Sequence, residues 1–221
     1  MISIEALKKA GLQYGYSRTR RHPTTAAHLY GSKNRTDIID LEKTAEMLTE
    51  ATEAVKALSA GGKQILFVGT KPEAKDLVKS IASSVNMPYV ENRWIGGTLT
   101  NECQIKARVN LLDDLSTKRD KNELVVMNKK ERLLVDRKIA KLDRNFSGLA
   151  SLSGLPAALV VVDTREEHIA VTEANKLGIP VIGICNSDCD LGVVSHPIVA
   201  NDGSKKSIEF FLSQIAQVIK G

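Results

Sequence analysis

The chain has 221 residues, which is enough for one large or two modest domains and lets a folded chain bury about 70% of its unfolded surface. With 43% hydrophobic and 26% charged residues, the composition excludes a disordered or collagen-like chain. The longest apolar run, residues 157–162, is too short to cross a membrane. Three cysteines, an odd and sparse set, argue against a disulfide framework and for a reducing compartment.

Positive charge is concentrated in two segments. Residues 1–36 hold seven Lys and Arg against one acid, a net of +6, and residues 103–145 hold twelve against seven, a net of +5. Each of the other two segments, 37–102 and 146–221, has a net of −3. This pattern indicates surfaces that meet a polyanion, although a merely solvated face stays open for the second segment.

The N-terminal segment divides into a helix and a loop. Residues 1–11 are expected to form a short amphipathic helix that Gly11 ends. Residues 15–35 mix Gly, Arg, Thr, Ser and Pro without a helical or alternating period, which predicts an extended loop that needs an outside partner to order it.

From residue 36 on, short apolar runs alternate with helical patterns. A short extended segment at 36–41 precedes a helix over 41–58, for which Asp40 is the expected N-cap. Strands are predicted at 64–68, 88–90, 158–162, 181–185 and 198–200, with helices from Pro72, over 166–177 and over 204–220. Near-continuous apolar strands alternating with helices imply a mostly parallel sheet covered on both faces.

Residues 100–145 break this alternation. Two sets of apolar residues recur at three- or four-residue spacing, with polar residues 118–122 between them, which predicts a helical hairpin. Asn128 followed by Glu131 is a capping-box variant that would open the second helix. Because each apolar stripe is narrow, we expect a protruding antiparallel coiled coil.

Enzymatic motifs are weak. The turn 69–71 lacks G-x-G-x-x-G, and Gly62-Lys63 does not complete a Walker A motif. Asp163 directly follows a strand, where capping of the following helix or turn is the more ordinary role. Cys185, Cys189 and His196 offer three zinc ligands, but the spacing fixes no fourth.

The segment Arg93–Asn101, RWIGGTLTN, stands between a strand and the hairpin. The arginine and the tryptophan offer faces that stack on nucleotides, and the glycine pair permits close backbone approach. The alternative is a packed hinge with Trp94 buried at the base of the hairpin.

Together with IIDLEKT at 38–44, ILFVGT at 65–70, SGLPAALVVVD at 153–163, HIA at 168–170 and EANKLGIP at 173–180, this segment resembles the bacterial-type ribosomal protein S2 family. The resemblance runs in order from about Leu7 to the C-terminus and includes the hairpin. Tyr16, the His22-Pro23 pair and residues 185–192 depart from the family's pattern.

The resemblance implies a flavodoxin-like three-layer α/β/α fold, with five parallel strands in the order 2-1-3-4-5 and an inserted coiled-coil hairpin. It also implies a non-enzymatic, cytoplasmic component of the small ribosomal subunit, between head and body on the solvent side. Its implied partners are ribosomal RNA and neighbouring proteins, with the mRNA-binding ribosomal protein S1 as a further candidate. No cofactor, membrane or homo-oligomer is expected, and an organellar origin stays open.

Four segments follow from this interpretation: 1–36 as a basic RNA-binding extension, 37–101 and 148–221 as the two parts of the α/β domain, and 102–147 as the hairpin. The hypothesis is that N-terminal cations neutralise RNA phosphates. The alternative is a nucleotide-binding or enzymatic flavodoxin-like protein; an adhesion module is disfavoured. The predicted RNA-binding residues are Arg18, Arg20, Arg21, Lys33, Arg35, Arg93, Trp94 and Asn101.

Overall fold

Five parallel strands form the central sheet, in the spatial order β5-β4-β6-β7-β8. The computed structural model describes residues 3–121 and 128–220. Every pairing in this sheet is parallel, and numbering the five strands along the chain gives the predicted order 2-1-3-4-5. The strands are β4 (Ile65–Val68), β5 (Tyr89–Val90), β6 (Ala158–Val162), β7 (Val181–Cys185) and β8 (His196–Val199).

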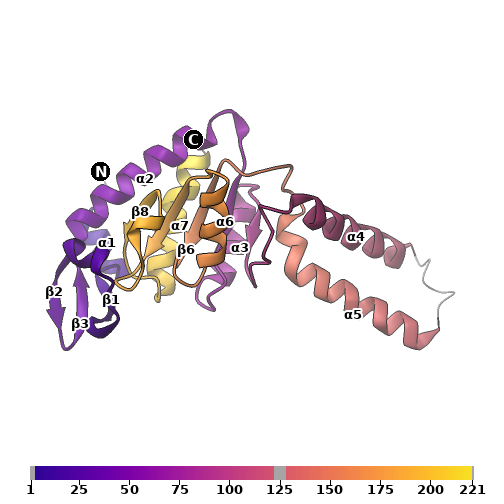
Figure 1. Ribbon diagram of the computed structural model, residues 1–221, viewed down its shortest axis with the longest axis horizontal. Coiled ribbons are helices and arrows are strands. Elements are labelled where there is room, and N and C mark those ends of the chain that lie inside the picture. Colours follow the sequence, from indigo (N-terminus) through magenta and orange to yellow (C-terminus); the bar gives the residue numbers. More distant parts are fainter. Residues whose placement is uncertain (1–2, 122–127, 221) are drawn as a thin grey trace.

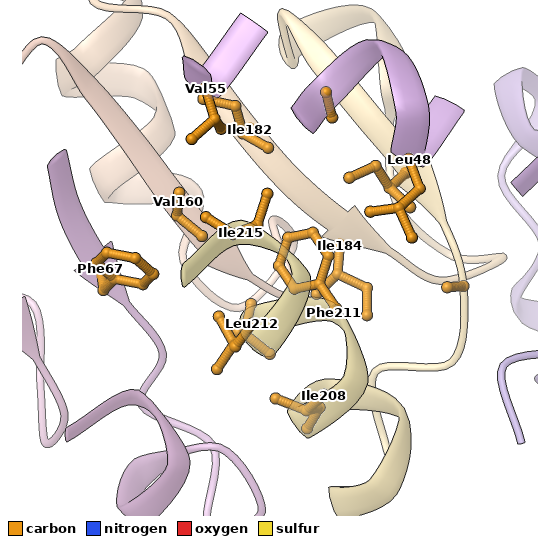
Figure 2. Packing of buried hydrophobic residues seen from close by; sticks show 14 of the residues in the cluster. Leu48, Val55, Phe67, Val160, Ile182, Ile184, Ile208, Phe211, Leu212 and Ile215 are labelled. Atoms are coloured by element: carbon orange, nitrogen blue, oxygen red, sulfur yellow. The ribbon is translucent and has the colours of Figure 1, made fainter. Parts of the chain in front are cut away.

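Helices cover both faces of this sheet (Figure 1). One face packs against α1 (Ile4–Ala10), α2 (Leu41–Ser59), α3 (Lys75–Ser84) and α7 (Lys205–Lys220). Because side chains alternate along a strand, Phe67 points into this layer and belongs to the same cluster as Val160 of β6 and Leu212 of α7 (Figure 2). Its neighbours Leu66 and Val68 pack on the opposite face. That face is covered by α6 (His168–Lys176) and by the base of the hairpin. The flavodoxin-like three-layer prediction is confirmed.

The helix boundaries follow local signals. Asp40 is the N-cap of α2, as predicted, and its carboxylate accepts a hydrogen bond from the Glu42 N–H at 3.1 Å. The helix expected from Pro72 begins later, at Lys75. The Lys71 carbonyl first closes a turn by accepting from the Ala74 and Lys75 N–H groups.

The N-terminal segment is folded, so the prediction of an extended loop that needs an outside partner is wrong. Strands β1 (Tyr14–Ser17), β3 (Thr36–Ile39) and β2 (Leu29–Lys33) form an antiparallel sheet in the order β1-β3-β2. These strands are hard to recognise from the sequence because two of them are rich in Gly, Ser and Tyr and lack an alternating apolar pattern. Each pairing also contains an irregular step in register.

This N-terminal sheet is attached to the central domain by hydrogen bonds to one serine. The Tyr16 N–H donates to Ser187 Oγ at 2.9 Å. The His22 N–H and the Thr25 hydroxyl both donate to the Ser187 carbonyl, at 2.8 and 2.9 Å. The segment is therefore ordered by contacts within the chain.

The hairpin consists of α4 (Glu102–Asp120) and α5 (Lys129–Phe146). It projects from the domain at the end opposite the N-terminal sheet (Figure 1). Ile105, Val109 and Leu112 of α4 and Ile139 and Leu142 of α5 are buried in one cluster. The Asn128 N–H donates to Glu131 Oε2 at 3.0 Å, so the predicted capping box opens α5.

Candidate nucleic-acid interface

Three of the predicted cations gather at one end of the N-terminal sheet. Lys33 and Thr36 pair across the turn between β2 and β3. Asn34 and Arg35 between them have φ of 51° and 63°, the conformation of a tight hairpin turn. The Arg18 N–H donates to the Arg35 carbonyl at 2.9 Å. Arg18, Lys33 and Arg35 are all exposed, so their charges add up on a small area of surface.

Arg20 is oriented by an aromatic ring. Its guanidinium carbon lies 5.6 Å from the centroid of the Tyr16 ring, a distance typical of cation–π contact. Lys71 is a second partner of this ring, since its ammonium also lies 5.6 Å from the centroid and 3.2 Å from the Tyr16 hydroxyl. Burial raises the pKa of the Tyr16 hydroxyl. Arg20 remains exposed, so a phosphate can still approach it.

Arg21 is engaged inside the protein. Its Nε donates to Asp37 Oδ2 at 2.8 Å, and a second guanidinium nitrogen donates to the other carboxylate oxygen of Asp37. The Asp37 side chain is fully buried, and the hydrogen bond to it raises the pKa of Arg21. Such a bidentate pair ties the short 3-10 helix Arg18–Arg20, which Arg21 follows, to Asp37 of β3. Of the five predicted N-terminal cations, Arg18, Arg20, Lys33 and Arg35 are therefore the exposed ones.

The segment 93–101 lies elsewhere, between the edge strand β5 and the hairpin. The carboxylate of Glu173 organises it by accepting hydrogen bonds from the N–H groups of Gly97 at 2.7 Å and Leu99 at 3.1 Å. Burial alone would raise the pKa of Glu173, but these donors outweigh burial and lower it. Sequence reasoning missed this residue, because its partners lie more than 70 positions away.

Trp94 is a packed residue of this hinge. Its side chain is 5% exposed, and its indole nitrogen donates to Glu173 Oε1 at 3.2 Å. A base cannot stack on a ring that is covered in this way, so the expectation of a stacking Trp94 is not supported, whereas the alternative of a buried hinge is. Arg93 and Asn101 are exposed. Since the N-terminal sheet lies beyond the β8 edge, the predicted residues fall into two separate areas.

A buried ion cluster fills the edge of the sheet where nucleotides bind in related folds. Lys71, after β4, lies 2.5 Å from Asp163 Oδ2 and 2.6 Å from Asp202 Oδ2. Desolvation opposes the charge of the ammonium, but the two carboxylates outweigh it and raise the pKa of Lys71. Asn186 donates to the other Asp202 oxygen at 2.6 Å. The protein thus supplies its own cation where a ligand or its metal would sit.

The two carboxylates differ because of their surroundings. Burial opposes ionisation of Asp163, but Lys71 and the N–H groups of Glu166 and Arg165 outweigh burial and lower its pKa. Its Oδ1 accepts from the Arg165 N–H at 3.0 Å, which confirms the predicted capping role. Burial and the neighbouring Asp163 charge raise the pKa of Asp202.

A cavity of about 370 Å³ adjoins this cluster. Its walls carry charges of both signs, with Arg20 and Arg165 facing Glu166 and Asp188. Arg165 is already within 2.5 Å of Asp188. No single sign of charge dominates the cavity, in contrast to the turn end of the N-terminal sheet.

The two cysteines among the candidate zinc ligands, Cys185 and Cys189, have other partners. Cys185 is fully buried next to the Thr164 hydroxyl at 3.2 Å, and Cys189 donates to Asp163 Oδ1 at 3.6 Å. The hydrogen-bonding interaction with Cys189, together with burial, raises the pKa of the Cys185 thiol. In residues 3–121 and 128–220, no group of three or more His, Cys, Asp or Glu side chains is arranged to hold a metal ion.

In the same described ranges, every helix is too short or too polar to cross a lipid bilayer.

Comparison with known proteins gives one consistent result. The family model described as ribosomal protein S2 matches residues 7–221. The small ribosomal subunit protein uS2 of Flavobacterium psychrophilum is 41% identical over 218 residues, covering 99% of this chain and 82% of the relative. The uS2 protein of Karelsulcia muelleri is 38% identical, covering 99% of this chain and 99% of the relative. That of Mesoplasma florum is 39% identical, covering 97% of this chain and 80% of the relative.

Proposed function

Because the chain belongs to the ribosomal protein S2 family, we propose that it is held on the RNA of the small ribosomal subunit by the exposed cations of its N-terminal sheet. The family is a structural one with a role in translation, not a family of enzymes. The single observation that supports this contact is the grouping of Arg18, Lys33 and Arg35 around one hairpin turn, with Arg20 nearby in the short 3-10 helix that follows β1.

Phosphate contacts suit a structural component because they position a protein without reading sequence. The sheet that carries these cations is already folded, so binding does not have to order it. Arg93 and Asn101, exposed at the base of the hairpin, form a second and smaller contact in this proposal. The folded shape of the RNA, rather than its sequence, then selects the site.

The test is the salt dependence of attachment. In a variant with Arg18→Gln, Arg20→Gln and Lys33→Gln, the chain should leave purified small subunits at lower salt. The slope of log affinity against log salt should fall by roughly two to three, at about 0.7 to 0.9 per contact. A control with Lys205→Gln, Lys206→Gln and Lys220→Gln removes as many exposed charges from α7. Equal behaviour of the two variants would contradict the proposal.

Protein partners form the second part of the proposal. We place the chain in the cytoplasm, as a single copy between the head and body of the small subunit, with the projecting hairpin reaching neighbouring components. Ribosomal protein S1 is a candidate partner of the globular end. Replacing residues 107–137 with a short linker should leave a folded core and lower the occupancy of the chain in small subunits.

The alternative of a nucleotide-binding protein is disfavoured because Lys71 occupies the place where a nucleotide phosphate would bind. A ligand phosphate at the carboxyl edge of the sheet would have to displace an ammonium held by two buried carboxylates. A thermal-shift screen of nucleotides should therefore show no saturable stabilisation.

A further inference from the structure

Arg20 and Arg21 are neighbours whose guanidinium groups have different partners. The donors of Arg21 are used inside the protein, since two of its nitrogens bind the Asp37 carboxylate. Among the described residues, no carboxylate lies within 4.0 Å of the Arg20 guanidinium, which instead contacts the ring of Tyr16. A ring attracts the charge of a guanidinium without accepting its N–H donors as a carboxylate does. The donors of Arg20 therefore stay available to an outside anion.

The backbone that carries Arg20 is fixed on both sides. Arg20 ends the short 3-10 helix that follows β1. At the start of this helix the Arg18 N–H donates to the Arg35 carbonyl at 2.9 Å, and directly after it Arg21 is bound to Asp37. What remains free is the long Arg20 side chain, which loses rotamer freedom when it binds an anion. A partner that already restricts this side chain lowers the entropic cost of binding.

Tyr16 can act as such a partner because the interior of the protein holds it. Its N–H donates to Ser187 Oγ at 2.9 Å, and its hydroxyl accepts from the Lys71 ammonium at 3.2 Å. That ammonium is held in turn by the carboxylates of Asp163 and Asp202, at 2.5 and 2.6 Å. A series of contacts thus runs from the buried ion cluster through the Tyr16 ring to an exposed guanidinium.

A second tyrosine of the N-terminal sheet lacks these contacts. In residues 3–121 and 128–220, both contacts of a cation with an aromatic ring involve Tyr16, one with Arg20 and one with Lys71. Tyr30 lies on β2 of the same sheet, and its side chain is 83% exposed. The two tyrosines therefore form a matched pair for experiments, since a cation contacts only the first ring within the described part of the chain.

We propose that Tyr16 is a positioning residue for RNA binding, whose ring holds the Arg20 guanidinium at the surface where its donors meet a backbone phosphate of ribosomal RNA. This inference rests on the proposed function, because it takes Arg20 as an RNA contact. Tyr16 acts through Arg20 and does not itself touch the RNA. A guanidinium that is held in advance loses less conformational freedom on binding, so the affinity rises without an added contact.

A double-mutant cycle tests whether Tyr16 acts through Arg20. Four full-length chains are compared: the unaltered chain, Tyr16→Leu, Arg20→Gln and the variant with both substitutions. The dissociation constant of each is measured on purified small subunits depleted of this protein. Tyr16→Leu should weaken binding about two- to fivefold, the size of an exposed cation–π contact. In the Arg20→Gln background the same substitution should change binding by less than about 1.5-fold, because the side chain on which it acts is absent.

A conservative variant separates the ring of Tyr16 from its hydroxyl. Tyr16→Phe keeps the ring but removes the hydroxyl that Lys71 contacts, so it should bind small subunits within about twofold of the unaltered chain. The control Tyr30→Leu removes an exposed ring from the same sheet and should leave binding unchanged. An equal loss in Tyr30→Leu would mean that the rings of this sheet touch the RNA directly, which would overturn the inference.

The remaining outcomes separate this inference from the proposed function. If Arg20→Gln binds as tightly as the unaltered chain, the RNA contact of the proposed function fails, and the role of Tyr16 fails with it. If Arg20→Gln binds more weakly but Tyr16→Leu does not, only the role of Tyr16 is refuted. The same conclusion follows if Tyr16→Leu weakens binding equally in both backgrounds, as a purely structural role would, or if Tyr16→Phe binds as weakly as Tyr16→Leu.

Discussion

The ammonium of Lys71 lies 2.6 Å from Oδ2 of Asp202, and the Asp202 side chain is fully buried. Because Asp163 holds the same ammonium from the other side at 2.5 Å, one cation compensates two carboxylates at the edge of the sheet. Removing it would leave two largely buried carboxylates close to each other without a compensating charge.

We therefore expect Lys71→Met to lower the free energy of unfolding by about 3–5 kcal/mol, because breaking a buried ion pair strands its partners. Denaturant unfolding of the purified chain measures this. The control is Lys79→Met, which removes a half-exposed lysine paired with Glu91 and should cost no more than about 1 kcal/mol. If both variants lost a similar amount of unfolding free energy, the buried cluster would contribute no more to stability than an exposed ion pair.

The parts of the fold that the sequence predicted are those set by local pattern. Buried runs such as 158–162 and the Asp40 cap can be recognised within a few residues, and the resemblance supplied the strand order. In the sequence, Lys71 is recognisable only as part of a turn without a phosphate-binding motif. Its role depends on Asp163 and Asp202, which are about 90 and 130 positions away and are brought together only by the parallel sheet.

The N-terminal sheet was missed for a related reason. Its buried charge, Asp37, sits in the short alternating segment 36–39, but nothing nearby in sequence shows that Arg21 is its partner. The Lys33-Asn34-Arg35 turn was a usable signal, because Asn favours the left-handed backbone region found there.

Arg20 and Arg21 should respond differently to substitution although they are neighbours. Arg21→Ala leaves the buried Asp37 carboxylate without its bidentate partner, so we expect the free energy of unfolding to fall by about 3 kcal/mol or more. Arg20→Ala removes an exposed side chain and should change stability by less than about 0.5 kcal/mol while weakening attachment to small subunits. Thermal unfolding and subunit occupancy, measured on the same two proteins, check both halves. The reverse pattern would mean that Arg21 is the RNA contact.

The stability of the hinge should depend on pH through Glu173. Its pKa is lowered in the folded chain, so its contribution is present above the ordinary glutamate value of about 4.3 and is lost as the pH falls through the lowered folded value. Glu173→Gln should remove this part of the acid dependence and cost about 1–3 kcal/mol near pH 7, because it leaves buried N–H donors poorly satisfied. Unfolding free energies between pH 7 and pH 3 measure the difference. An unchanged pH slope in the variant would count against the assigned role.

Gly148 should tolerate no side chain. A Cβ at this position would lie 2.3 Å from the Tyr89 carbonyl oxygen, a backbone atom that β5 holds in place. Gly148→Ala should therefore destabilise the chain by about 1–3 kcal/mol through overpacking, which denaturant unfolding would detect. Gly154→Ala is the matched control, since nothing lies within 4 Å of its added Cβ. A neutral Gly148→Ala would show that β5 shifts easily.

The chain contains one tryptophan, and that residue is Trp94, enclosed at the junction of hairpin and sheet. Its fluorescence is thus a built-in spectroscopic reporter for a single location. A change in emission before the loss of far-ultraviolet circular dichroism would reveal loosening of this junction while the remaining helices and strands persist, without any attached dye.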